Sequence, residues 1–101
     1  MTVRAKTLEP LDLSRTYIRW TNLSQTNLAG TNFTDADCEG VNFRGSDFRD
    51  AVFLRTNLKG ADFAGALNLT REQLARTIID AHTILPDYLR AEGSRILESA
   101  K

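Results

Sequence analysis

Few side chains in this 101-residue chain could carry out chemistry, and they are not gathered in one motif. There is one histidine, His82, and one cysteine, Cys38. A catalytic arrangement of nucleophile, base and orienting group needs more than this. Asp and Asn are frequent, but they recur five residues apart, so we interpret them as residues that hydrogen-bond nearby backbone in turns. We therefore expect no enzymatic activity, metal site, cofactor or small-molecule substrate.

His82 and Cys38 each have a plain structural interpretation. We expect His82 to lie in a linker between two helices, where it is solvated or caps a helix. A pH-sensitive contact is the alternative, because histidine titrates near neutrality. Cys38 stands at a position expected to point inward, which favours a small buried side chain over a reactive thiol. A single cysteine forms no internal disulfide, as is typical of cytoplasmic proteins.

The elements that position these side chains follow from a period of five. From Leu13 to Phe63, every fifth residue is Leu, Ile, Phe or, once, Cys. A mostly small residue stands two places before each of them, and Asn or Asp usually stands between, as in residues 26–28 (Thr-Asn-Leu). Neither the helical period of 3.6 nor the strand period of 2 gives this spacing. A fixed short period indicates a repeat architecture.

The units in residues 11–65 resemble those of the pentapeptide-repeat family, whose pattern is a small residue, Asp or Asn, Leu or Phe, and two variable positions. The resemblance covers eleven consecutive units. It implies a mainly β fold, a right-handed quadrilateral β-helix with one unit on each side and four in each turn. Eleven units would make about three turns. The central and small residues would point inward and the other positions outward.

Residues twenty apart should then stack at roughly the 4.8 Å spacing of neighbouring strands. Charges alternate down two outer columns, as directly opposed cross-strand charges should; these columns are Arg15, Asp35, Arg55 and Arg19, Glu39, Lys59. On the inside, Phe33 should stack on Phe53 and Phe43 on Phe63. Glycines would share corners, where they relieve backbone strain.

We interpret the chain as a single domain with three parts: an N-terminal cap or degenerate repeat (1–10), the β-helix (11–65) and a C-terminal α-helical cap (66–101). The exposed end turns of a β-helix invite aggregation, so both ends should be covered. Residues 70–73 form a capping box that predicts a helix over about 71–80, with Leu74 and Ile78 on its apolar stripe. A second helix should begin at Pro86 and carry three apolar residues: Leu89, Ile96 and Leu97.

Four outward positions are apolar or aromatic where the pattern favours polar residues: Tyr17, Trp20, Val52 and Leu54. The helical cap could cover the last two. The ring of Trp20 could lie over the column of Gly40 and Gly60. The functional alternative is a protein-binding surface, because Trp, Tyr and Arg are favoured at interface hot spots; its residues would be Arg15, Tyr17, Arg19 and Trp20.

Composition limits the classes of function. Thirteen basic residues balance thirteen acidic ones, and residues 11–65 carry six basic and seven acidic residues, a net charge of −1. Direct nucleic-acid binding is therefore not expected, because phosphate affinity needs clustered Lys and Arg. No apolar run approaches the roughly 18 residues of a membrane span. The first ten residues lack the apolar stretch of a secretion signal, so we expect a cytoplasmic protein.

These observations favour a non-enzymatic protein-interaction module or small scaffold with an unidentified protein partner. The family resemblance offers an alternative, because some pentapeptide-repeat proteins mimic duplex DNA and engage DNA gyrase. Those proteins are long, acidic, dimeric rods, and this chain differs in length and charge. A further alternative is a purely structural homodimer that pairs through the second helix, at Leu89, Ile96 and Leu97.

Overall fold

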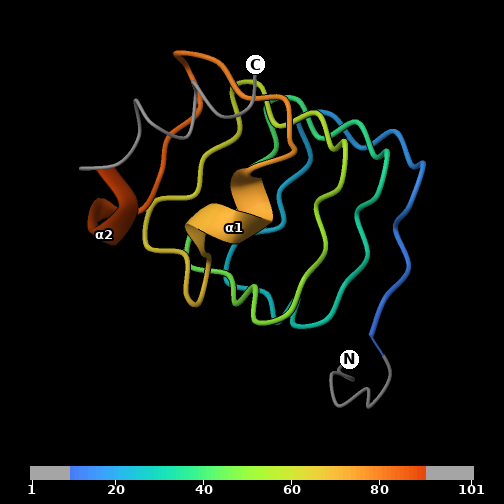
Figure 1. Ribbon diagram of the computed structural model, residues 1–101, viewed down its shortest axis with the longest axis horizontal. Helices are drawn as coiled ribbons and strands as arrows, with labels where there is room; N and C mark the ends of the chain where they lie inside the picture. Colours follow the sequence, from blue (N-terminus) through green and yellow to red (C-terminus); the bar gives the residue numbers. More distant parts are fainter. Residues whose placement is uncertain (1–9, 91–101) are drawn as a thin grey trace.

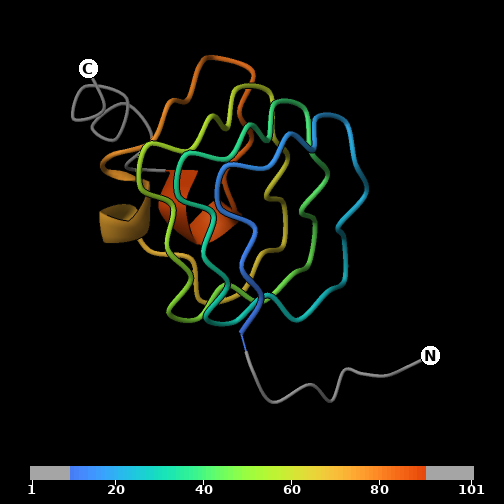
Figure 2. The same cartoon turned by 90° about the vertical axis from the view of Figure 1, so that its right-hand side faces the viewer.

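The structure is a computed structural model that describes residues 10–90. Within them the backbone winds into a coil whose successive turns pair in parallel, twenty residues apart (Figures 1 and 2). We call its single turns, residues 11–30, 31–50 and 51–70, the first, second and third coils, and we use "the coil" for all of them together. The coil has four sides, numbered in chain order, and each is a column of bridged residues: Asp12, Asn32, Val52; Tyr17, Asp37, Asn57; Asn22, Asn42, Asp62; and Asn27, Asp47, Leu67.

Each corner is a turn that the repeat sequence specifies. At most corners the amide of a unit's first residue donates to the carbonyl of the preceding central residue, as from Thr31 to Leu28 at 3.0 Å; at Thr26 the amide donates to the Ser46 hydroxyl instead (3.1 Å). The fifth residue of all eleven units has a positive φ, from +53° at Gln25 to +73° at Gly30, as a type II turn requires. The nine Asp and Asn side chains at second positions each accept a hydrogen bond from an amide two residues on. Their interpretation as turn formers is confirmed.

The core is a column of aromatic rings. Phe33 stacks on Phe53 with centroids 4.9 Å apart and planes 1° apart, and Phe43 stacks on Phe63 at 4.9 Å and 12°. Both predicted stacks are confirmed. Cys38 is fully buried, and burial raises the pKa of its thiol to about 12. At neutral pH it is therefore an inert, protonated side chain.

The coil continues past residue 65, where the regular sequence pattern ends. Leu67 bridges to Asp47, and in a closing segment (residues 71–90) Ile78 bridges to Asn57 and Ile84 to Asp62. The other two sides of this last turn are taken by two short helices, α1 (Arg71–Leu74) and α2 (Asp87–Arg90). Figure 1 shows α2 at the end of the molecule away from the blue start of the first coil, with α1 nearer the middle of the view.

The helix predicted over about 71–80 is wrong beyond Leu74. The capping box is present, with Thr70 and Gln73 bonded reciprocally, but α1 is four residues long. Ile78 makes two backbone hydrogen bonds to the third coil. Its amide donates to Thr56 O (2.9 Å), and its carbonyl accepts from Leu58 N (2.7 Å). A longer helix would leave those buried strand groups unpaired, which costs more than the lost helical hydrogen bonds. Leu74 is buried as expected, whereas Ile78 is half exposed.

Side chains also complete the closing segment. The Gln73 Nε2 group donates to the carbonyls of Phe48 (2.8 Å) and Ala51 (2.9 Å), where a fourth strand on the first side would have supplied an amide. The Tyr88 hydroxyl accepts from Leu69 N (2.9 Å) and donates to Ala66 O (3.2 Å). At this end of the coil, side chains of the closing segment therefore bond backbone groups that no further regular turn pairs.

Candidate interaction surface

The four residues expected to bind a partner all lie on the second side and adjoining corners of the first coil. Tyr17 occupies the second position of its unit, where the pattern has Asp or Asn, and bridges to Asp37. Arg15 and Trp20 occupy corner positions with φ of +59° and +61°. The structure thus gathers Arg15, Tyr17, Arg19 and Trp20 on two consecutive units.

Tyr17 and Arg19 form a fixed pair. Tyr17 is 71% exposed, and the guanidinium carbon of Arg19 lies 5.1 Å from the centre of its ring, within the range of a cation–π contact. Arg19 is held from the other direction by Asp37 (3.0 Å) and Glu39 (3.5 Å). The hydrogen bond from Arg19 lowers the pKa of Asp37 below its usual value, so this carboxylate stays ionised at neutral pH.

Trp20 lies over Gly40, as expected. A Cβ atom built on Gly40 would come within 2.6 Å of the indole Cδ2, so only glycine leaves room for the ring. Trp20 nevertheless remains 73% exposed. Its ring is therefore seated on the backbone of the second coil and presents most of its surface to solvent.

Arg15 differs from Arg44 and Arg55, the ion-paired arginines of the second and third coils. Below it in its column, Arg55 holds Asp35 through two hydrogen bonds of 2.7 and 3.0 Å, which lower the pKa of that carboxyl. Within residues 10–90, Arg15 itself has no ion pair or side-chain hydrogen bond. The alternation of charge down the column thus ends in a cation at the first coil.

The other positions named from the sequence are not brought to this surface. Cys38 is buried in the core. His82 is exposed, with its Nδ1 3.7 Å from the Asp80 carboxylate. Leu89 is only 6% exposed and belongs to the apolar core, while Ile96 and Leu97 lie outside the described residues. Val52 stays 44% exposed, so the closing segment does not cover it.

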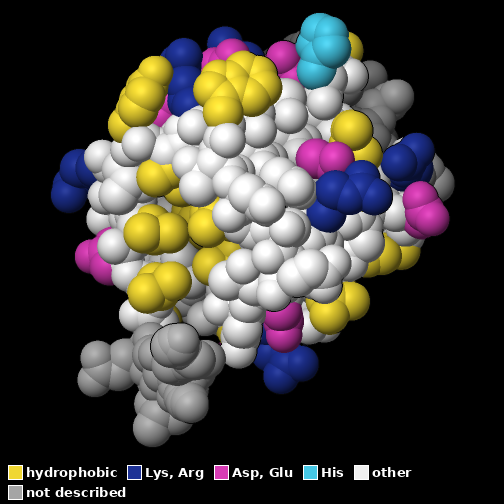
Figure 3. All heavy atoms as spheres, turned by 180° about the vertical axis from the view of Figure 1, so that it is seen from behind, with side chains coloured by type: hydrophobic (Ala, Val, Ile, Leu, Met, Phe, Trp, Pro, Cys, Tyr) yellow, Lys and Arg dark blue, Asp and Glu magenta, His cyan; other side chains and the backbone are white. Residues whose placement is uncertain are grey.

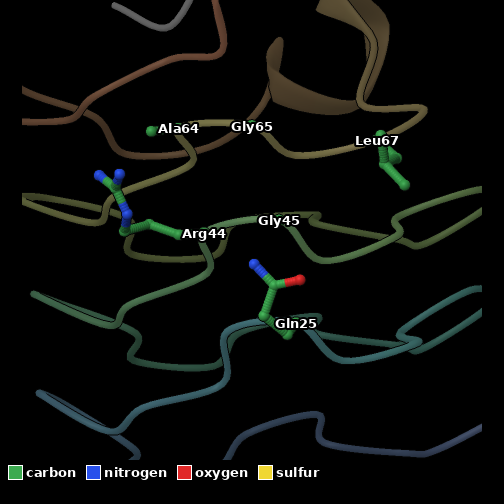
Figure 4. A pocket seen from close by; sticks show the side chains of 6 residues that line it. All are labelled: Gln25, Arg44, Gly45, Ala64, Gly65 and Leu67. Carbon is green, nitrogen blue, oxygen red and sulfur yellow. The ribbon is translucent and has the colours of Figure 1, made fainter.

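A second surface feature was missed by the sequence reasoning. Hydrophobic residues occupy outward positions at the end of the third coil and in the closing segment: Leu67, Ile78 and Ile84, between 38% and 53% exposed. The signal was the pair of short β-branched runs in residues 77–79 and 83–84, which continue the repeat imperfectly. A shallow hollow of ≈ 430 Å³ lies beside Leu67, along the corner of Gly45 and Gly65, with Gln25 and Arg44 at its border (Figure 4). It holds no convergent polar groups beyond these.

Metal chemistry has no site in the part of the chain that the structure describes. No three or more His, Cys, Asp or Glu side chains come together there in a way that could hold an ion. In residues 10–90 there is likewise no helix long and apolar enough to cross a membrane.

A sequence model of pentapeptide repeats matches residues 12–50 and 36–71, with eight copies in all. The chain belongs to the pentapeptide-repeat family. The recognition made from the sequence is therefore confirmed, together with the repeat solenoid that the stacked coils display. None of the curated proteins compared with the chain matches it.

Two solved structures of pentapeptide-repeat proteins resemble this chain. One, from the cyanobacterium Cyanothece 51142, has a TM-score of 0.67 and 24% identity and covers 77% of this chain. The chain spans about half the length of that protein, 52%. The other, from Nostoc Pcc 7120, has a TM-score of 0.34 and 23% identity, covering 90% of this chain and 83% of its own. The first likeness extends the family assignment to the fold.

Proposed function

We propose that this pentapeptide-repeat protein is a non-enzymatic interaction module that binds a protein partner through Arg15, Tyr17, Arg19 and Trp20. The observation that carries the proposal is the exposure of two aromatic side chains on one unit of the first coil, Tyr17 at 71% and Trp20 at 73%, the most exposed of the large hydrophobic side chains in residues 10–90. Such an aromatic pair flanked by arginines has the composition of an interface hot spot.

The surface is also ordered before a partner arrives. Arg19 is fixed by two carboxylates and by the Tyr17 ring, and Trp20 rests on Gly40. Side chains that are already held lose less conformational entropy on binding, which favours affinity. These contacts support a binding role in addition to a packing role for Trp20.

Two alternatives receive less support. Engagement of DNA gyrase by DNA mimicry would need an acidic surface, whereas Asp35, Asp37 and Asp62 are each paired with an arginine. Homodimerisation through Leu89, Ile96 and Leu97 would have to rely chiefly on the two residues outside the described range, because Leu89 packs in the core.

The test is co-purification from a lysate of the source organism with the native protein and the double variant Tyr17→Ala/Trp20→Ala. The matched control is Val52→Ala/Leu67→Ala, which removes two exposed apolar side chains from other sides of the coil. A stoichiometric partner lost only with the Tyr17/Trp20 variant supports the proposal. A partner retained by that variant, or lost equally with the control, contradicts it.

A further inference from the structure

The two ends of the coil differ in how their backbone N–H and C=O groups are hydrogen-bonded. At the C-terminal end, the closing segment supplies bridges and the side chains of Gln73 and Tyr88. At the other end, within residues 10–90, no hydrogen bond is made by the backbone N–H or C=O of the four bridge residues of the first coil: Asp12, Tyr17, Asn22 and Asn27. In the second coil, the corresponding groups of Asn32 pair with Leu11 O and Leu13 N.

The same end exposes apolar surface. Of the four central residues of the first coil, Leu13, Ile18 and Leu23 are only partly buried and Leu28 is buried, whereas all four of the second coil are fully buried. Leu11 is 48% exposed. Figure 3 shows hydrophobic side chains gathered at the side of the molecule where the described chain begins. An unpaired strand edge beside an apolar surface is a template for the addition of another strand.

The charges at this edge indicate what would cover it. In the columns of Arg15 and Arg19, basic and acidic residues alternate, and each column ends at the first coil in an arginine. The next residue in either column should therefore be acidic, because opposite charges directly across strands are stabilising and like charges are not.

We propose that the first-coil edge, at Asp12 and Tyr17, binds an extended strand of a partner protein that adds to the coil in parallel. This strand has apolar residues over Leu13 and Ile18 and acidic residues beside Arg15 and Arg19. Its backbone pairs with the free N–H and C=O groups of Asp12 and Tyr17. The inference rests on the proposed function, since it gives the chemistry of a partner bound by the same coil.

The test uses two synthetic ten-residue peptides that continue the repeat, TNLSETNLEG and its charge-reversed control TNLSKTNLKG. Each is added to the full chain at up to about 1 mM, which detects dissociation constants into the millimolar range. Binding is followed by the fluorescence of Trp20, the only tryptophan, and by amide hydrogen exchange at Asp12 and Tyr17. We expect the acidic peptide to slow exchange at both amides and the basic peptide to bind about tenfold more weakly, as two exposed ion pairs would give.

Variants sharpen the test. Arg15→Glu should remove most of the preference for the acidic peptide, whereas Arg49→Glu, an exposed arginine of the second coil, should leave it unchanged. The inference is overturned if neither peptide binds or if both bind equally. It is also overturned if the Tyr17 amide is already protected from hydrogen exchange without peptide. Protection that rises with protein concentration would mean that a second copy of the chain covers the edge. Protection that does not change with concentration would mean that the chain covers the edge itself.

The outcomes for the two proposals are separable. If neither peptide binds but capture of a partner still depends on Tyr17 and Trp20, the strand inference fails and the proposed function stands. If the acidic peptide binds but capture does not depend on these aromatic residues, the edge site is supported and the aromatic surface is not.

Discussion

Replacing Gln73 by alanine tests whether the closing segment completes the coil. The Gln73 side chain donates to the carbonyls of Phe48 and Ala51 and accepts from Thr70 N at 2.8 Å. Three lost hydrogen bonds at about 0.5–1.5 kcal/mol each give a loss of about 1.5–4.5 kcal/mol. Because Gln73 is only half-buried and water can reach part of the site, we expect a value near 2 kcal/mol.

The assay is urea unfolding followed by circular dichroism. With a slope of about 1–1.5 kcal/mol/M for a chain of this size, the Gln73→Ala midpoint should fall by more than about 1 M. Gln73→Glu, which keeps the acceptor for Thr70 N but loses both donors, should be destabilised similarly at pH 7. The control is Gln25→Ala, since Gln25 lies exposed over Gly45 and its side chain has no hydrogen bond in residues 10–90. Equal midpoints for Gln73→Ala and Gln25→Ala would refute the reasoning.

Three further predictions concern the coil itself. Phe43→Ala should cost about 3–5 kcal/mol, and Phe43→Asp, which buries an unpaired charge in the ring stack, should abolish the cooperative thermal transition; a variant that melts like the parent would contradict the inward assignment. Thr56→Val should lower the free energy of unfolding in urea by about 1 kcal/mol, because the buried Thr56 Oγ1 donates to Phe33 O at 2.7 Å. The control is Thr31→Val, because Thr31 is equally buried but its hydroxyl makes no such bond in residues 10–90; it should lower the free energy of unfolding by less than about 0.5 kcal/mol. Hydrogen bonds from arginine lower the pKa of Asp35 and Asp37 below 3.8, so the two ionised carboxylates stabilise the folded protein above their unfolded-state pKa, and this stabilisation is lost as the pH falls through their folded-state pKa values. The free energy of unfolding should therefore be the same at pH 7 and pH 5 and lower at pH 3. An unchanged free energy of unfolding at pH 3 would contradict this.

The repeated part of the fold could be predicted because the residues of each unit specify the conformation of that unit. A small residue, an Asp or Asn that bonds the next turn and a central apolar residue recur at a fixed spacing, and the twenty-residue offset predicted the stacking of Phe33 on Phe53 and the pairing of Asp35 with Arg55. The seat of Trp20 on Gly40 followed from the same offset.

The closing segment could not be predicted in the same way. A capping box and an apolar spacing of four favoured a long helix, and local sequence gave no measure of the unpaired strand groups on the third coil. Those groups bond Ile78 and Ile84 and so end α1 at Leu74. The open first-coil edge was also missed, because it is defined by hydrogen bonds that no residue pattern records.

Co-purification with the aromatic variants tests the central claim most directly, that the first coil is a protein-binding surface. The native protein and Val52→Ala/Leu67→Ala should capture the same stoichiometric partner from a lysate of the source organism, and Tyr17→Ala/Trp20→Ala, shown by circular dichroism to be folded, should not. Capture of that partner by the folded Tyr17/Trp20 variant at the native level would contradict the account.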